Sequence, residues 1–594
     1  MTRPSIIERL RSDPALQLVV VAVIAAIAIY APAVAYGLVS YEDPWLIRDN
    51  WIVHEPSWSS LHAIWFDNSK PTRFVLGAEY LPIRDLSIML DAAIWGDWYG
   101  GFHLTNLVLY AGAIVVWFAA LVGFGIDRRI AAVMALIWAL HPSHVESVVW
   151  LSERKGLLSV VFTGVAALGY ARFRAGLQWR YLALAMVAAV CAIWSKAPSA
   201  FALAAFAGLE LLLPEHRRSW ARSAVGLGAI AAVALAAFIP VLIIANVMGV
   251  VTADDHAAAG KLATVFGLHG FYLKLSALAV RNSISYPIAS EGPAAADIAL
   301  GAVGLAAIVA VLVIPARGKW QPPAALRAAA LIWLFGWFPI SRIALPLRAV
   351  LVADRYVLFA TLGIALAAAV GIRKLPGRTG HALLVVIALA AGLRSLDARS
   401  SWHSSQALWE RAVTENPGDG DAWSLYSEAL ADAGQHDLAV AAVDEGQKHS
   451  SSPRLILRAA LLAIGRGDRA TAFSLMQQAA EGGEPKAMSN FALLLLDANR
   501  VDEALSWATK AVQQTPLYAP AHRAYGRAAL AAHKPDRALA AFSRAYELEA
   551  TCTNRFNLAL ALLELGRHKD AYGHLEACVN DQALGPRARA ILKR

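Results

Sequence analysis

The sequence predicts an all-α protein in two parts, a polytopic membrane helix bundle of about eleven spans followed by an α-solenoid of helical repeats. Hydrophobic residues make up 58% of the 594 residues and charged residues 16%, whereas an average soluble domain carries roughly 25% charged residues. The deficit is confined to residues 1–397, where long apolar runs alternate with short basic breaks. From residue 398 the charge is ordinary and repeats begin, so we predict a membrane domain at 1–397 and a soluble domain at 398–594.

A membrane span needs about 20 apolar residues, and the first domain approaches this length at about eleven places. The candidate segments are 16–39, 104–125, 130–148, 156–171, 181–195, 199–213, 223–249, 296–315, 328–341, 356–371 and 380–397. Alternate breaks between them are short and basic, as cytoplasmic loops are. The pattern predicts a multi-pass inner (plasma) membrane protein with a cytoplasmic N-terminus and a periplasmic C-terminal domain. The expected outward loops include 40–103, 141–155, 250–295 and 342–355.

The first apolar segment has a second interpretation. Arg3, Arg9 and Arg11 precede it, and the small residues "APAVA" at 31–35 end it. This order is also typical of a cleavable signal peptide. We expect the segment to be an uncleaved anchor that forms the first span.

The net charge of +9 does not indicate a nucleic-acid partner. The basic residues fall in short breaks between apolar runs, as membrane topology requires. The sequence has no basic stripe interleaved with aromatic residues, which is the pattern that binds single strands. We therefore expect membrane lipid, and not nucleic acid, as a partner.

The first outward loop begins with two adjacent carboxylates, Glu42 and Asp43, in "SYEDPWLIRDN". One interpretation is a simple polar cap at the membrane surface, and the other is a catalytic base. Several basic residues are expected on the non-cytoplasmic side of the membrane, although basic residues usually favour the cytoplasmic side. Binding of an anionic lipid phosphate would explain their position. These residues are Arg154, Lys155, Lys196, Arg281, Arg342, Arg348 and Arg355. If the loops meet, they form a cationic pocket in which a neighbouring carboxylate stays ionised and acts as a base.

The second outward loop, "HPSHVESVVWLSERKG" at 141–156, offers metal-ligand types. His141, His144 and Glu146 have near-helical spacing, and His103 lies in "FHLTN". These four residues are candidates for orienting a substrate or binding a divalent cation. The alternative is that they are solvated residues at the membrane interface. The sequence does not otherwise indicate a cofactor.

The order of motifs resembles a known family. "YEDPWLIRDN", "YLPIRDLSIMLDAAIWG", "HPSHVESVVWLSERKGLLS", "SKAPSAF" and "ADRYVLFATLGIAL", followed by helical repeats, are similar to the transmembrane-and-TPR proteins related to protein O-mannosyltransferases, within the GT-C glycosyltransferase superfamily. The resemblance implies a polyprenyl-phosphate-linked sugar donor and an acidic catalytic base just after the first span. Three positions depart from the family pattern: Glu42 replaces Asp, Leu81 replaces Arg, and Gly156 replaces Asp.

The resemblance implies an inverting transfer in which Asp43 or Glu42 removes a proton from an acceptor hydroxyl. Arg154, Lys155, Lys196 and Arg355 would hold the phosphate of the leaving lipid. The acceptor would be Ser or Thr of a protein, or an envelope glycan. One alternative is a non-catalytic membrane scaffold for envelope or appendage assembly. Another is a transporter, which the scarcity of charges within the spans disfavours.

The soluble part repeats with a period close to the 34 residues of TPR units. The second helix of each unit is expected to start within "GQHDLAV", "GRGDRAT", "NRVDEAL", "KPDRAL" and "GRHKDAY". The small residues aligned for close helix packing are Ala439, Ala470, Ala504, Ala538 and Ala571. A further helix, "SSQALWERAVTENP", precedes the first unit. The groove of such a solenoid would hold an acceptor protein or an assembly partner, unless the repeats only brace the membrane domain.

Two of the three cysteines lie in the last repeat. Cys552 opens the first helix of that repeat and Cys578 closes the second. The two ends of an antiparallel helix hairpin are neighbours, and disulfides persist outside the cytoplasm. A disulfide between Cys552 and Cys578 is therefore one expectation, and two buried thiols are the other.

Overall fold

The computed structural model is all-helical, and the described residues contain no strand. It describes residues 8, 11–176, 178–211, 219–249, 258–278, 282–286, 292–314, 322–341, 343 and 352–593. The chain divides into two compact units, Met1–Glu415 and Asn416–Arg594. The predicted fold class, a membrane helix bundle followed by a helical-repeat solenoid, is confirmed.

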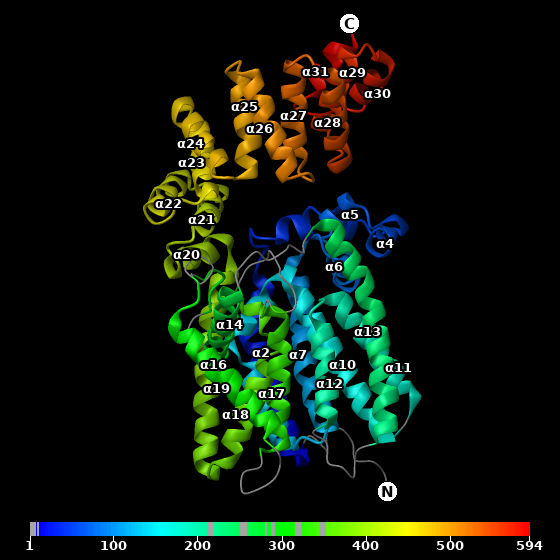
Figure 1. Cartoon of the computed structure of the whole chain (residues 1–594), viewed down its shortest axis with the longest axis vertical. Coiled ribbons are helices and arrows are strands. Elements are labelled where there is room, and N and C mark those ends of the chain that lie inside the picture. The colour runs from blue at the N-terminus through cyan, green and yellow to red at the C-terminus, as the bar shows by residue number, and fades with distance from the viewer. Residues whose placement is uncertain are drawn as a thin grey trace. The chain divides into compact units, whose positions relative to one another are not determined.

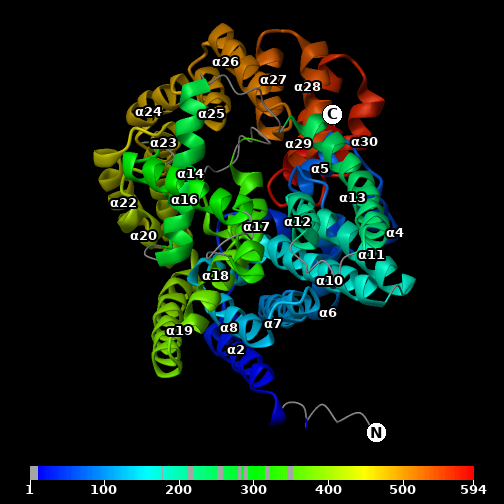
Figure 2. The ribbon, with the colours of Figure 1, turned by 60° about the horizontal axis from the view of Figure 1, so that its bottom comes forward.

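The first unit is a bundle of long apolar helices. Among the described residues its helices of more than ten residues are α2 (Pro14–Tyr30), α6 (Pro82–Trp95), α7 (Tyr99–Gly123), α8 (Arg128–Ala139), α10 (Arg154–Gly176), α11 (Trp179–Ser195), α12 (Ser199–Leu211), α13 (Trp220–Met248), α14 (Ala258–Leu278), α16 (Ala295–Val313), α17 (Ala324–Trp337), α18 (Thr361–Lys374), α19 (Gly377–Ser400) and α20 (Ser405–Glu415). Figure 2 shows α2, α7 and α8 side by side, and these three helices pack on one another. Helix α10 packs between α7 and α11.

Fewer helices are long enough to cross a membrane than the sequence suggested. Among the described residues six helices have the required length and composition, or seven if the pair Arg128–Ala139 and Pro142–Val149, bent by 61°, forms one span. Each of the eleven predicted segments contains a helix, but several of these helices are short. Helix α12 has 13 residues and α17 and α18 have 14 each, and a helix rises only about 1.5 Å per residue.

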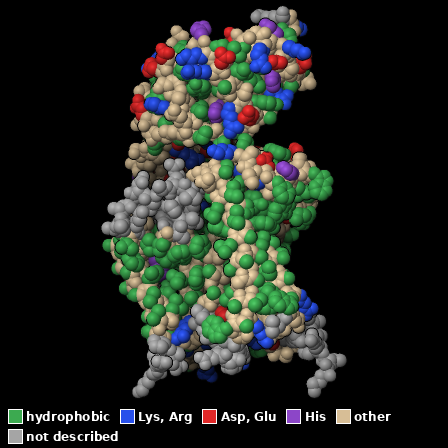
Figure 3. All heavy atoms as spheres, turned by 45° about the vertical axis from the view of Figure 1, so that its right-hand side comes forward, with side chains coloured by type: hydrophobic (Ala, Val, Ile, Leu, Met, Phe, Trp, Pro, Cys, Tyr) green, Lys and Arg blue, Asp and Glu red, His purple; other side chains and the backbone are tan. Residues whose placement is uncertain are grey.

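The surface of the first unit suits a lipid environment. Figure 3 shows hydrophobic side chains covering most of one face of this unit, whereas the second unit carries mixed acidic and basic side chains. Exposed apolar residues occur along several of the long helices, for example Ile24, Leu235, Val303 and Leu389. Water would disfavour such a surface, so these helices are suited to lipid contact.

Residues 258–278 differ from the sequence prediction, which placed them in an outward loop. They form α14, which packs along α16. The helix carries His269 and Lys274, which interrupt its apolar pattern. Both have partners, since His269 Nδ1 lies 2.9 Å from the carbonyl oxygen of Gly301 and Lys274 Nζ lies 2.6 Å from Asp297 Oδ1. The polar residues that hid this helix in the sequence therefore pair with its neighbour.

The second unit contains five helix hairpins and a final helix. The helices are α21 (Gly420–Asp432), α22 (His436–His449), α23 (Pro453–Gly465), α24 (Arg469–Glu481), α25 (Pro485–Asp497), α26 (Val501–Gln514), α27 (Ala519–Ala531), α28 (Pro535–Leu548), α29 (Cys552–Glu564), α30 (His568–Glu576) and α31 (Gly585–Leu592), and Figure 1 shows successive hairpins stacked side by side. A residue with positive φ lies in the turn of every hairpin, as a tight helical turn requires. These residues are Gly434, Gly467, Asn499, His533 and Gly566.

One of the aligned alanines was placed in the wrong register. Ala439, Ala504, Ala538 and Ala571 are fully buried between helices, as expected, but Ala470 is exposed. Ala472, two residues later, is buried in its place. Arg469 is the first residue of α24, so Ala470 lies in the first turn of the helix and Ala472 reaches the packed face.

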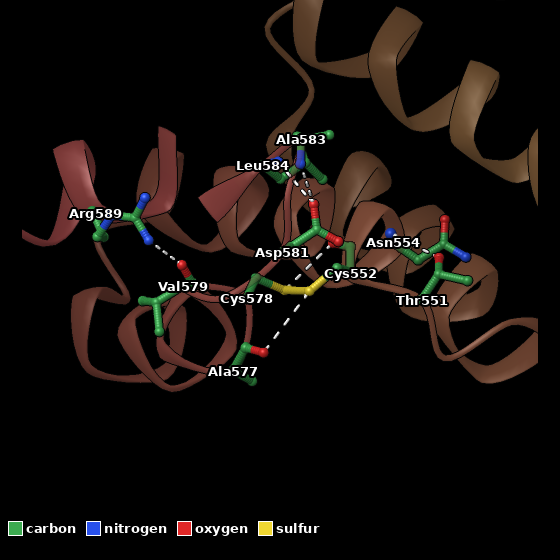
Figure 4. Close-up of a disulfide and its surroundings, with 10 residues drawn as sticks. All are labelled: Thr551, Cys552, Asn554, Ala577, Cys578, Val579, Asp581, Ala583, Leu584 and Arg589. Carbon is green, nitrogen blue, oxygen red and sulfur yellow. Dashed lines mark hydrogen bonds between the residues drawn. A yellow bond between two sulfur atoms is a disulfide. The ribbon is translucent and has the colours of Figure 1, made fainter. Parts of the chain in front are cut away.

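A disulfide joins Cys552 to Cys578 in the last hairpin (Figure 4). Their Cα atoms lie 5.5 Å apart, with 26 residues of sequence separation. Cys552 begins α29 and Cys578 follows α30. The bond therefore ties the two ends of the hairpin together, and Cys191 is a free cysteine.

The buried and exposed alanines of α24 allow a test of the repeat register. Ala472→Leu adds three carbon atoms to a packed helix interface and should lower the free energy of unfolding of the repeats by about 1–3 kcal/mol. Ala470→Leu, two residues away on the exposed side, should change it by less than about 0.5 kcal/mol. Thermal unfolding of the two variants measures the difference, and equal losses would contradict the assigned register.

Candidate functional site

The first unit contains a cavity of about 560 Å³ with a charged part and an apolar part. The apolar lining comes mainly from α12, α13 and α17 and the segment before α18. It includes Phe201, Phe238, Val241, Leu242, Phe335, Ile340, Leu358 and Phe359. The charged lining consists of Glu42, Glu79, Arg84, Glu153, Lys155, Lys196 and Arg355. A cavity with this lining is suited to an amphipathic anionic ligand.

The charged residues come from segments far apart in the sequence. Glu42 precedes the short helix Pro44–Arg48, and Glu79 precedes α6. Lys155 lies in the first turn of α10, and Lys196 follows the end of α11. Arg355 lies in the short helix Asp354–Tyr356. Of the residues predicted to meet in one pocket, four thus line the cavity: Glu42, Lys155, Lys196 and Arg355.

One side of the charged part is a chain of alternating charges. Glu153 forms ion pairs with Lys196 and, at 3.8 Å, with the Nε of Arg355. Arg355 also pairs with Glu146, and its backbone N–H donates to Glu146 Oε2 at 2.9 Å. The Arg355 guanidinium lies 5.2 Å from the centroid of the Trp150 ring, a cation–π distance. These contacts fix Arg355 and Lys196 at the cavity wall.

Gly156 makes room for this arrangement. A Cβ atom at Gly156 would lie 2.8 Å from Glu153 Oε1 and 3.6 Å from Lys196 Nζ. A side chain there would have to displace the Glu153 carboxylate. The absence of a side chain at Gly156 therefore leaves space for the Glu153 carboxylate to pair with Lys196.

The other side is built around Glu79. Lys155 Nζ lies 2.8 Å and Arg84 Nη1 lies 3.0 Å from Glu79 Oε2. Arg84 is buried and also pairs with Asp85 at 2.8 Å. Burial alone would raise the pKa of Glu79, but the charges of Lys155 and Arg84 outweigh it and hold that pKa below its usual value. Sequence reasoning missed Glu79, because its partners are distant in sequence and a lone Glu in a loop carries no signal.

Glu42 differs from the other carboxylates of the cavity. It lines the cavity, and no ion pair within 4.0 Å involves it among the residues that the structure describes. Burial raises the pKa of Glu42, and the positive charges of Lys155 and Arg355 only partly oppose this shift. A partly buried carboxylate with a raised pKa is a stronger base than an exposed one once it is ionised.

Asp43 does not line the cavity. It is buried, and its Oδ1 accepts hydrogen bonds from the hydroxyl of Ser152 at 2.5 Å and from the Ser152 N–H at 3.0 Å. Its Oδ2 accepts from the N–H of Val39 at 3.2 Å. Burial raises the pKa of Asp43 to about 6 against these hydrogen bonds. The geometry therefore separates the two adjacent carboxylates, with Glu42 facing the cavity and Asp43 anchoring the loop.

Arg154 also lies away from the cavity, unlike its neighbour Lys155. Its guanidinium is fully buried and pairs with Asp91 at 2.5 Å. It also donates to Asn106 Oδ1 at 2.7 Å and to the carbonyl oxygen of Phe102 at 2.8 Å. Because these partners occupy its donors, Arg154 joins α10 to α6 and α7 and does not extend toward a phosphate in the cavity. This placement corrects the predicted donor-binding set.

The histidines do not form a metal centre in the described part of the chain. His144 lies 2.8 Å from the Tyr110 hydroxyl through Nδ1 and 2.8 Å from Thr361 Oγ1 through Nε2. His141 Nε2 lies 2.8 Å from the carbonyl oxygen of Ser276. His103 is buried against the ring of Tyr36, and Glu146 pairs with Arg355. No group of three or more His, Cys, Asp or Glu side chains that could hold a metal occurs there.

Three further basic residues were predicted from the sequence to lie near the pocket. Arg281, Arg342 and Arg348 lie outside the described residues. The cations assigned to the cavity are therefore Arg84, Lys155, Lys196 and Arg355.

Comparison with known proteins identifies the repeats. The model of the tetratricopeptide repeat family matches residues 389–453. The C-terminal part of the chain forms helical repeats similar to tetratricopeptide repeats. Residues of this chain are also 29% identical over 140 positions to protein O-mannosyl-transferase Tmtc1 of Drosophila melanogaster. That similarity covers 23% of this chain and 16% of the Drosophila protein.

Several TPR proteins of known structure are similar to part of this chain. YrrB, described as a TPR protein with an unusual peptide-binding site, is 16% identical, and the likeness covers 31% of this chain and 97% of YrrB with a TM-score of 0.26. The thermophilic TPR protein TTC0263 of Thermus thermophilus is 20% identical over 30% of this chain and 100% of its own, with a TM-score of 0.26. PilF of Pseudomonas aeruginosa is 16% identical over 28% of this chain and 79% of its own, with a TM-score of 0.26.

The raised pKa of Asp43 predicts a pH-dependent stability. The pKa of Asp43 is about 6 in the folded chain against a usual value of 3.8. The contribution of the protonated Asp43 carboxyl to stability is therefore fully present below pH about 4 and is lost as pH rises through about 6. Asp43→Asn removes this ionisation. As pH rises from 4 to 7, the free energy of unfolding of the variant should therefore fall by up to about 3 kcal/mol less than that of the wild type. Thermal unfolding in detergent at several pH values measures this.

Asp49→Asn is the control for this prediction. Asp49 is exposed, and its hydrogen bond with Arg48 lowers the pKa of its carboxyl. The Asp49→Asn variant should therefore keep the wild-type rise in stability toward low pH. An Asp43→Asn variant with the full wild-type dependence would show that Asp43 is not the group responsible.

Proposed function

We propose that this chain is a membrane glycosyltransferase that moves a sugar from a polyprenyl-phosphate-linked donor to an acceptor on the outer face of the membrane. The observation that carries the proposal is the cavity, which joins four fixed cations and the carboxylate of Glu42, unpaired among the described residues, to an apolar wall. A lipid-phosphate sugar has the matching chemistry, an anionic centre between a polar sugar and a hydrocarbon tail. The limited similarity to protein O-mannosyl-transferase Tmtc1 supports the same reaction class.

The donor would occupy both parts of the cavity. Its phosphate would lie beside Lys155, Lys196 and Arg355, where charge-assisted hydrogen bonds are strong. The first units of its lipid would contact apolar residues of α13 and the neighbouring segments, such as Phe238, Leu242 and Phe359. The carboxylates Glu79 and Glu153, which pair with the lysines in the absence of donor, would give up part of this pairing to the phosphate.

The chemical step is a direct displacement at the anomeric carbon. The Glu42 carboxylate takes the proton of the acceptor hydroxyl, and the acceptor oxygen forms a new bond to the anomeric carbon. The bond between that carbon and the phosphate oxygen breaks, and the electron pair leaves with the lipid phosphate. Lys155, Lys196 and Arg355 stabilise the added negative charge. Attack from the side opposite the leaving group inverts the anomeric configuration.

The repeats would recruit the acceptor, which we propose is a protein carrying Ser or Thr or an envelope glycan. Solenoid repeats present extended surfaces for protein partners. The Cys552–Cys578 disulfide supports a location of this unit outside the cytoplasm, because disulfides persist in oxidising compartments. The outward loop of Glu42 would then lie on the same, periplasmic side of an inner membrane.

A non-catalytic scaffold is the second candidate, and one observation favours it. Each of the four cavity cations already has a carboxylate partner, Glu79 for Arg84 and Lys155, Glu153 for Lys196, and Glu146 for Arg355. A resting cavity that is neutralised in this way needs no ligand. Binding of a polyprenyl phosphate to the purified chain distinguishes the two candidates, because a scaffold would not bind it.

Substitution of Glu42 tests the transferase. Glu42→Gln keeps the size of the side chain and removes the base, so kcat for sugar transfer should fall by about 10²–10⁴, while the donor still binds. Transfer from polyprenyl-phosphate-linked hexoses to an acceptor peptide or glycan, followed by mass spectrometry, measures the effect. Glu55→Gln, at an exposed position in the same outward loop, should transfer at the wild-type rate. A Glu42→Gln enzyme with wild-type kcat would exclude Glu42 as the base.

A further inference from the structure

The loop that carries Glu42 is held on both sides of that residue. On one side, Asp43 is anchored to Ser152 at the start of the segment before α10. On the other side, the N–H of Ser40 donates to Ser405 Oγ at 2.8 Å. The ring of Tyr41 lies edge-on to Trp409, with ring centroids 5.5 Å apart. Glu42 stands between these attachments and lines the cavity.

The second attachment comes from α20, a helix that follows the last membrane helix. Trp409 is 3% exposed. Arg411 attaches α20 to the end of α19, because its Nη2 lies 3.0 Å from Asp397 Oδ2 and its Nη1 donates to the carbonyl oxygen of Asp397 at 3.1 Å. Helix α20 belongs to the first unit, although the tetratricopeptide match at 389–453 covers it. It is therefore a fixed part of the unit that contains the cavity.

A series of ring contacts links Trp409 to Arg355 in the charged lining of the cavity. Tyr41 packs on Trp150 with centroids 5.0 Å apart, and Trp150 lies beneath the guanidinium of Arg355 at 5.2 Å. Trp402, just before α20, packs on the same Trp150 at 6.2 Å. These ring contacts thus connect α20 both to the loop that carries Glu42 and to the guanidinium of Arg355.

We propose that Ser405 and Trp409 are positioning residues for the base at Glu42, so that the segment after the last membrane helix completes the active site. The proposal rests on the proposed function. Without Ser405 and Trp409 the loop keeps the anchor at Asp43 and the packing of Tyr41 on Trp150, but it loses both contacts with α20. The carboxylate then samples a wider range of positions relative to the acceptor hydroxyl. A displacement near 1 Å is enough to cost about 10²-fold in rate.

Variants of the full-length chain test the proposal through kcat, the KM for donor, and hydrogen exchange of residues 36–46. Trp409→Ala should lower kcat by about tenfold or more with the KM for donor unchanged, because the cavity cations remain in place. Trp409→Phe keeps an aromatic contact with Tyr41 and should restore most of kcat. Ser405→Ala removes one hydrogen bond and should cause a smaller loss of kcat in a chain that is otherwise folded.

Two controls separate positioning from loss of folding. Glu410→Ala changes an exposed residue of the same helix, and Trp423→Ala removes a tryptophan of the second unit that is 8% exposed. Both should keep wild-type kcat for a small acceptor and wild-type exchange at residues 36–46. Wild-type kcat in both Trp409→Ala and Ser405→Ala overturns the proposal.

Hydrogen exchange distinguishes failure of this inference from failure of the proposed function. If the wild-type chain transfers no sugar, the proposed function is wrong, whatever the variants do. Faster exchange at residues 36–46 in Trp409→Ala, but not in Trp423→Ala, would still support the attachment of the loop to α20. Unchanged exchange in Trp409→Ala overturns that attachment.

Discussion

Charges buried beside a membrane must be paired, and the polar part of the cavity is arranged around this requirement. Removing one partner of a buried pair typically costs about 3–5 kcal/mol. Glu153 forms ion pairs with both Lys196 and Arg355, and Glu79 forms ion pairs with both Lys155 and Arg84. The shared carboxylates hold four cations at the cavity wall without filling the cavity. Glu42 stands apart, because no such pair engages it among the described residues, and it is free to exchange a proton.

The same requirement explains the position of the neighbouring polar residues. Asp43 and Arg154 belong to motifs that also supply cavity residues, yet both are engaged in structural contacts, with Ser152 and with Asp91. These contacts fix the backbone next to Glu42 and next to Lys155. In each adjacent pair one side chain is anchored and the other faces the cavity. The geometry of the site therefore depends on residues that do not line the cavity.

Much of the fold was predictable, because apolar runs and repeat spacing are local properties of the sequence. The helices of the bundle and the five hairpins follow these patterns, whereas α14 was missed because His269 and Lys274 interrupt its apolar run and pair with α16. The candidate site was predictable only in part. Basic residues on the predicted outward loops pointed to Lys155, Lys196 and Arg355, but the choice between Glu42 and Asp43 depends on which way each side chain turns. Glu79 and Trp409 join the site through contacts distant in sequence, which spacing does not reveal.

The proposed reaction requires a lipid phosphate to bind among the cavity cations with its tail along the apolar wall. An experimental structure of the chain with a short polyprenyl phosphate tests this requirement. We expect the phosphate within hydrogen-bond distance of Lys155, Lys196 or Arg355, with the lipid beside Phe238 and Leu242. A cavity that stays empty at saturating ligand, with every cation still paired to its carboxylate, would contradict it.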